Sequence, residues 1–77
     1  MKRRGDIDIA KRAAAVLLER EAQTGVSTRQ QLEGMGMSRQ ALYQWGHASQ
    51  LPGGDALSRM AHAGYDVMYV LTGRRTK

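Results

Sequence analysis

The chain has 77 residues, a net charge of +5 and no cysteine. A domain of this size buries only about 60% of the surface that its unfolded chain exposes, which leaves little room for an active-site cleft. The absence of cysteine excludes disulfides and cysteine-based zinc fingers. We therefore expect a single domain spanning residues 1–77, with no enzymatic activity and no cofactor, and the charge points to an anionic partner.

The excess positive charge lies at the two ends of the chain, in short basic arms that we place at residues 1–5 and 74–77. Residues 5–73 hold six basic and seven acidic side chains. The terminal cations are Lys2, Arg3, Arg4, Arg74, Arg75 and Lys77. Two interpretations stay open: solubilising tails, or arms that seek the phosphates of a duplex, which carries one negative charge per roughly 1.7 Å.

The longest unbroken apolar runs are Ala13–Leu18 and Val67–Leu71. Both are far shorter than the roughly 20 residues of a membrane-spanning helix. The N-terminal residues also lack the apolar region and cleavage site of a secretory signal. We expect a soluble, intracellular protein that does not bind membranes.

The first predicted helix covers residues 8–22. Asp6 or Asp8 can cap its start, and Gly25 can end it. Its apolar residues recur at helical spacing on one side, opposite polar residues such as Arg12. The apolar positions are Ile9, Ala10, Ala13, Val16 and Leu17.

Two short helices are predicted next. The first begins after Ser27 or Thr28, whose hydroxyls can accept hydrogen bonds from free backbone N–H groups, and extends to about Met35. The second covers residues 39–47, with Ser38 as its N-cap.

The helix at 39–47 has two sharply different faces. One face carries only long side chains that form hydrogen bonds, without an acidic residue: Arg39, Gln40, Tyr43, Gln44 and His47. The other face carries Ala41, Leu42, Trp45 and Ala48. We interpret Leu42 and Trp45 as anchors that fix the helix to a core.

Two further elements follow the loop at 52–54. Asp55 can cap a helix that Gly64 ends. We expect the side chains of Leu57, Met60 and Ala61 in this helix to point inward. Asp66 can cap the last element, residues 67–71, which is apolar all round, so its pattern does not choose between a buried helix and a short strand. Its apolar surface indicates a partner.

A short helix, a tight connection and a second helix with a polar outer face form the helix-turn-helix arrangement, whose second helix lies in the DNA major groove. Arg39 can contact guanine, and Gln40 or Gln44 can pair with adenine. Tyr43 can contact a thymine methyl group or a phosphate. Ser38, at the helix N-terminus, suits a phosphate.

These residues resemble the Cro/phage-repressor-like (XRE-type, lambda-repressor-like) DNA-binding domains. The matching segments are GMSRQALYQW at 36–45, LP at 51–52 and LSRMAHAGYDVMYVLTG at 57–73. The resemblance implies an all-α, compact bundle of about five short helices with a helix-turn-helix, in which residues 67–71 are helical. It also implies a transcriptional regulator, a phage or prophage repressor that binds a near-palindromic operator as a dimer.

Carried over by position, the resemblance implies that one set of residues contacts DNA bases and another contacts phosphates. The base contacts are Arg39, Gln40, Tyr43 and Gln44. The phosphate contacts are Thr28, Arg29 and Ser38, to which we add His47. We predict that the homodimer forms through Val67, Met68, Val70 and Leu71, with half-sites about 34 Å apart.

The chain departs from the family pattern at two places. The family usually has glycine five residues after an apolar one in the helix before the turn, whereas Leu32 precedes Gly36 by four. Either Leu32 fills the site of a small residue or the turn is one residue shorter. The family also tends to have glycine three residues after Trp45, where this chain has Ala48.

The alternative function is a protein-interaction module, such as a toxin-neutralising partner or an adaptor that uses the apolar C-terminal segment. A metal site is not expected, because His47 and His62 lack a nearby cluster of ligands. Ser58, His62 and Asp66 are helix neighbours without an oxyanion motif, so they do not indicate a hydrolase. We expect no small-molecule ligand, and a bacterial cytoplasmic location, on the nucleoid when bound to DNA.

Overall fold

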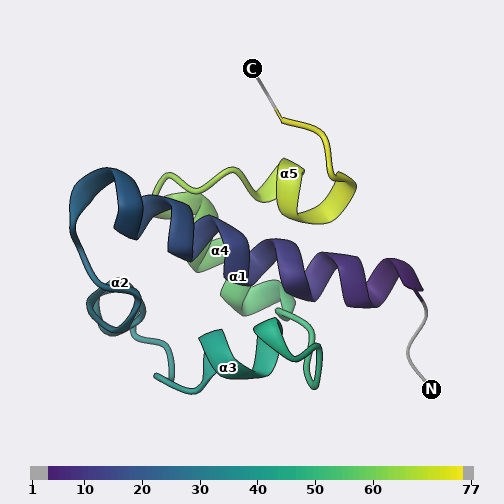
Figure 1. Ribbon diagram of the computed structural model, residues 1–77, viewed down its shortest axis with the longest axis horizontal. Coiled ribbons are helices and arrows are strands. Elements are labelled where there is room, and N and C mark those ends of the chain that lie inside the picture. Colours follow the sequence, from purple (N-terminus) through teal and green to yellow (C-terminus); the bar gives the residue numbers. More distant parts are fainter. Residues whose placement is uncertain (1–3, 76–77) are drawn as a thin grey trace.

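Five helices and no strand form residues 4–75, the part of the chain that this computed structural model describes. In chain order they are α1 (Arg4–Thr24), α2 (Thr28–Gly34), α3 (Ala41–Gly46), α4 (Gly54–His62) and α5 (Val67–Thr72). The long helix α1 is central and packs against α2, α3 and α5 (Figure 1). The predicted all-α bundle is confirmed.

The N-terminal helix is longer than the sequence predicts. It begins at Arg4 instead of residue 8, so Arg4 and Gly5 form its first turn and do not belong to an extended arm. Asp6 lies within that turn, where a carboxylate interacts favourably with the positive end of the helix dipole. Lys2, Arg3 and Lys77 lie outside the described residues.

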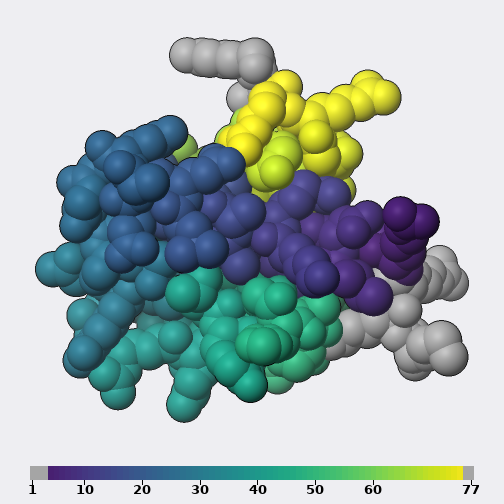
Figure 2. Space-filling model, in the orientation of Figure 1, coloured from purple at the N-terminus to yellow at the C-terminus, as the bar shows by residue number. Residues whose placement is uncertain are grey.

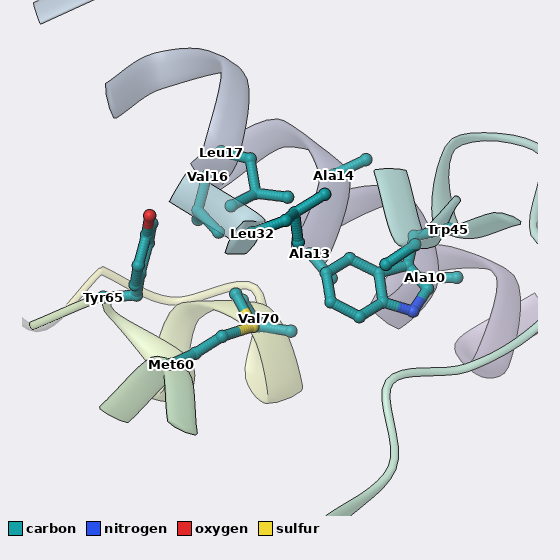
Figure 3. Close-up of a cluster of buried hydrophobic side chains, with 11 residues drawn as sticks. Ala10, Ala13, Ala14, Val16, Leu17, Leu32, Trp45, Met60, Tyr65 and Val70 are labelled. Carbon is teal, nitrogen blue, oxygen red and sulfur yellow. The ribbon is translucent and has the colours of Figure 1, made fainter. Parts of the chain in front are cut away.

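The core is built around a face of α1 that consists mainly of small residues. Buried positions on this helix are Ala10, Ala13, Ala14, Val16 and Leu17. Because alanine has a short side chain, α3 can bring the large indole of Trp45 against α1, as Figure 3 shows. Leu32, Met60 and Val70 complete the core from α2, α4 and α5, and each is almost fully buried.

The start and the inner face of α4 differ from expectation. Its N-cap is Gly53, and Asp55 lies in the first turn. Met60 is fully buried and Leu57 is half-buried, whereas Ala61 is exposed, so the prediction that Ala61 points inward is wrong. A helix of nine residues that packs along a single narrow stripe buries few positions.

The last element is a helix and not a short strand, the two structures that its sequence pattern left open. At its start, Asp66 Oδ1 accepts a hydrogen bond from the N–H of Tyr69 (3.0 Å). At its end, Arg12 Nε donates to the carbonyl oxygen of Val70 (2.9 Å). Helix C-termini leave carbonyl oxygens without partners inside the helix. A residue expected on the solvent side of α1 therefore stabilises the end of α5.

Three helices end in a Schellman motif, in which a residue in the left-handed region follows the C-cap. Gly36 and Gly64 occupy this position after α2 and α4, with φ of +72° and +92°. After α3 the position belongs to Ala48, with φ of +54°. The N–H of Ser49 donates to the carbonyl oxygen of Gln44 (2.9 Å), which completes the same motif.

Within residues 4–75, the side chain of Gln31 is polar and buried in the core. Gln31 Nε2 donates to the carbonyl oxygens of Leu17 (3.0 Å) and Val26 (2.9 Å). Gln31 Oε1 accepts a hydrogen bond from the hydroxyl of Tyr65. Burial raises the pKa of the Tyr65 hydroxyl, although the nearby Arg20 guanidinium opposes this, so the hydroxyl stays protonated as a donor. The network ties α2 to α1 and to the connection between α4 and α5.

Candidate nucleic-acid interface

The N-terminus of α2 is defined by a capping box. Ser27 Oγ accepts from the N–H of Gln30 (3.1 Å), and Gln30 Oε1 accepts from the N–H of Ser27 (3.1 Å). Ser27 is therefore the N-cap, and Thr28 is the first helical residue. Arg29 follows on the exposed side, with its Nε 3.6 Å from Glu33 Oε2. Surface pairs of this kind contribute at most about 1 kcal/mol, so the guanidinium can leave Glu33 for another anion.

Helix α3 starts two residues later than predicted. Its N-cap is Gln40, and Ser38 caps a separate tight turn in front of it. In that turn, Ser38 Oγ accepts from the N–H of Gln40 (3.2 Å), and the Ser38 carbonyl oxygen accepts from the N–H of Ala41 (3.1 Å). The predicted helix start at Arg39 is thus part of this turn, because the bond from Ala41 spans three residues and not the four of an α-helix.

The two faces of α3 differ in burial as the sequence predicts. Trp45 is 4% exposed and Ala41 7% exposed. Leu42 is half-buried and packs against the core. Tyr43, on the opposite side, is 67% exposed. The apolar side therefore holds α3 on α1 and leaves the polar side in solvent.

The predicted contact residues in α3 and next to its two ends differ in exposure and in what holds them. Arg39, Gln40 and His47 are exposed, and Gln44 is half-buried. The ring of His47 lies against that of Tyr43, with centroids 4.2 Å apart and planes inclined by 41°. This contact restricts the Tyr43 ring on an otherwise open surface.

Arg39 differs from most other arginines of the described chain. It makes no hydrogen bond or ion pair with any residue between 4 and 75. The guanidinium groups of Arg12, Arg20, Arg59 and Arg75 bond to backbone or carboxylate oxygens, whereas those of Arg4 and Arg74 resemble that of Arg39 in having no such bond within this range. The Arg39 side chain is free to bind an external acceptor.

The described part of the C-terminal arm lies against the bundle. Arg75 pairs with Glu19 of α1, and its guanidinium lies 3.7 Å from the centre of the Tyr69 ring. Figure 2 shows this C-terminal segment and α3 at opposite edges of the same view, with α1 between them. An arm in this position does not extend the polar surface of α3.

The predicted dimer residues divide between the core and the surface. Val70 is 0% exposed, which leaves it no surface for the predicted dimer contact, and Val67 is half-buried against the core. Met68 and Leu71 are 52% and 42% exposed. The reason is the helical form of α5, which turns only part of an apolar segment toward solvent.

A polar cleft of about 300 Å³ lies between α3 and the start of α4. Ser38 and Gln44 line one wall, and Asp55 and Arg59 line the other. The sequence interpretation missed Arg59, which bonds to the turn before α3. The spacing of Asp55 and Arg59 indicates an ion pair, but only the fold reveals the second contact of Arg59.

No group of three or more His, Cys, Asp or Glu residues that could hold a metal ion is found within residues 4–75. No helix in this range is long and apolar enough to cross a membrane. Comparison of the chain with models of protein families, with curated proteins and with solved structures finds no match.

Proposed function

We propose that the chain is a sequence-specific DNA-binding transcriptional regulator, a Cro-like repressor of the phage or prophage kind. In this proposal α2 and α3 form a helix-turn-helix, and α3 enters the major groove. The observation that carries the proposal is the division of α3. Trp45 is buried against α1, whereas Tyr43 is exposed on the opposite side, and Arg39 is exposed in the turn that precedes the helix.

The chemistry of the exposed residues suits base recognition. The guanidinium of Arg39 offers two parallel N–H donors, which match guanine O6 and N7. Gln40 and Gln44 offer the donor and acceptor that adenine requires. The Tyr43 ring, restricted by His47, provides an apolar surface for a thymine methyl group.

Phosphate contacts would come from the edges of this surface. Thr28 and Arg29 lie in the first turn of α2, and Ser38 lies in the turn before α3. The helix dipole favours an anion near such N-termini. Release of Arg29 from its weak pair with Glu33 (3.6 Å) would cost little.

The regulator would act as a homodimer in the bacterial cytoplasm. Met68 and Leu71 are the exposed members of the predicted interface, and we assign the contact to them. A two-fold axis at this patch would give a near-palindromic operator with half-sites about 34 Å apart. Occupation of promoter DNA would then exclude polymerase.

The same exposed residues favour a second candidate, a protein-interaction module. Met68 borders a hollow of about 520 Å³ that Thr72, Arg74 and Arg75 also line. A protein partner that covers this hollow would form a stable complex with the chain. This candidate predicts little salt-sensitive affinity for DNA.

Selection of bound sequences from a random duplex pool tests the proposal. We expect a near-palindromic motif whose half-sites lie one helical turn apart, and an affinity that falls steeply with added salt. Enrichment of no sequence, together with salt-insensitive binding, would refute DNA recognition and favour the interaction module.

A further inference from the structure

We propose that Arg59 is a positioning residue that fixes the orientation of α3. It does so through a side-chain bridge from α4 to the turn between α2 and α3. The consequence for DNA recognition rests on the proposed function. The bridge itself is a property of the free protein.

Two hydrogen bonds hold the guanidinium of Arg59 in place. Its Nη1 donates to the carbonyl oxygen of Met35 (2.8 Å), and its Nε donates to Asp55 Oδ2 (3.0 Å). Asp55 lies one turn earlier in α4 and is itself highly exposed. A planar guanidinium held at two points has a fixed direction, which a single contact would not give it.

The carbonyl oxygen of Met35 has no hydrogen-bond donor within α2, and Arg59 supplies one. Met35 is the C-cap of α2, where backbone oxygens lack partners inside the helix. The N–H groups of Gly36 and Met37 bond back to Glu33 and Leu32 (3.0 and 2.9 Å). These bonds satisfy the carbonyl groups of Glu33 and Leu32, and Arg59 provides a donor for that of Met35.

The backbone at Gly36 is shaped to admit Arg59. A Cβ atom at this position would lie 2.8 Å from Arg59 Nη1, which is closer than real Cβ contacts come. Gly36 also has φ of +72°, a left-handed conformation that glycine adopts without a steric cost. The left-handed backbone therefore favours glycine here, and an added Cβ would displace the tip of the Arg59 side chain from its present position.

The position of the bridge explains why it would act on α3. Trp45 fixes the C-terminal half of this helix to α1. The N-terminal end, with Arg39 and Gln40, continues directly from the turn that Arg59 holds. Loss of the bridge would leave the first turn of α3 held by packing alone, through the small buried Ala41 and the half-buried Leu42, so that this end of the helix could tilt.

The orientation of α3 can be measured in the free protein from residual dipolar couplings of backbone amides. In Arg59→Gln we expect the couplings of residues 41–46 to change relative to those of α1. Arg20→Gln is the matched control, because Arg20 Nη1 also bonds to a backbone oxygen, that of Ala63 (2.9 Å), away from the turn. An unchanged orientation of α3 in a folded Arg59→Gln protein would overturn the proposal.

A second variant tests the proposal even if Arg59→Gln does not fold. Asp55→Asn keeps Arg59 but removes the charge that orients it, and we expect a smaller change of the same couplings. If Arg59→Gln does not fold, an unchanged α3 in Asp55→Asn refutes the bridge.

With DNA, the expected effect concerns discrimination. On a duplex selected by the natural protein, Arg59→Gln should reduce the ratio of specific to random affinity about tenfold, as expected when a base contact is lost. The slope of affinity against salt should stay the same. Arg59→Lys should show the same loss, because a flexible ammonium keeps the charge but not the two-point contact.

A changed salt dependence with unchanged discrimination would give Arg59 a different role. If Arg59→Gln lowers the slope of log affinity against log salt concentration by the amount expected for about one phosphate contact, and leaves the ratio of specific to random affinity unchanged, Arg59 contacts a phosphate. That result would overturn the positioning role. If the natural protein selects no duplex, the proposed function fails, and the dipolar couplings still decide the role of Arg59.

Discussion

Replacement of Ala48 by glycine should stabilise the protein. Ala48 is in the left-handed region, with φ of +54°, at a position that glycine fills after α2 and α4. A side chain with a Cβ atom costs roughly 1–2 kcal/mol in this conformation. Glycine avoids that cost but gives the unfolded chain more freedom, which removes about 0.4–1 kcal/mol of the gain.

The methyl group of Ala48 offsets another part of the gain. Ala48 is half-buried and packs against the core, and burial of one methyl group contributes up to about 0.8 kcal/mol. Half of that is lost in Ala48→Gly, which leaves a net stabilisation of about 0.5 kcal/mol. For a domain of this size, the corresponding rise in Tm is about 2–4 °C.

Gly64→Ala is the matched opposite change. Gly64 has φ of +92°, and an added Cβ would meet only Arg20 Nη2, at the ordinary contact distance of 3.6 Å. Backbone strain therefore dominates, and after the gain in unfolded-state entropy we expect a loss of about 1 kcal/mol.

Urea denaturation with a common slope measures both variants. The two should shift the midpoint in opposite directions. A destabilised Ala48→Gly protein, or a Gly64→Ala protein as stable as the natural chain, would show that left-handed strain does not govern these helix ends.

Three further predictions concern the candidate interface and the core. Arg39→Ala or Gln44→Ala should weaken specific binding by roughly 1–3 kcal/mol and leave binding to random duplexes nearly intact; titration of both duplexes checks this, and equal losses would refute base reading. Tyr65→Phe should lower the free energy of unfolding by about 1–3 kcal/mol, because Gln31 Oε1 loses its buried donor; thermal and urea unfolding measure it, and an unchanged stability would contradict the network. Removal of residues 74–77 should leave the slope of DNA affinity against salt unchanged, because Arg75 is paired with Glu19 at the edge of the bundle opposite α3 (Figure 2); a flatter slope would show that the arm contacts phosphates.

The sequence by itself determined the features that depend on near neighbours. Helical spacing predicted the buried side of α1, and the contrast between the two faces of α3 predicted an inward Trp45 and an outward Tyr43. Capping chemistry placed the start of α2 within one residue of Ser27. These features follow from periodicity and from hydrogen bonds between residues a few positions apart, so the local sequence contains the information.

Predictions that required a distance between elements were less successful. The sequence placed Val70 on a dimer surface and Ala61 in the core, but the structure reverses their burial. Both errors have the same cause. An apolar residue on a short helix can face the core or solvent, and only the neighbouring helices decide which side is covered.

Tertiary structure alone decided how the polar groups are paired. Arg12 lies 58 residues before Val70, whose carbonyl oxygen it binds, and Arg59 lies 24 residues after Met35. A guanidinium reaches such a partner only after packing has brought two helices together. The sequence therefore specifies which residues form the polar face of α3, whereas contacts between distant segments hold that face in its orientation.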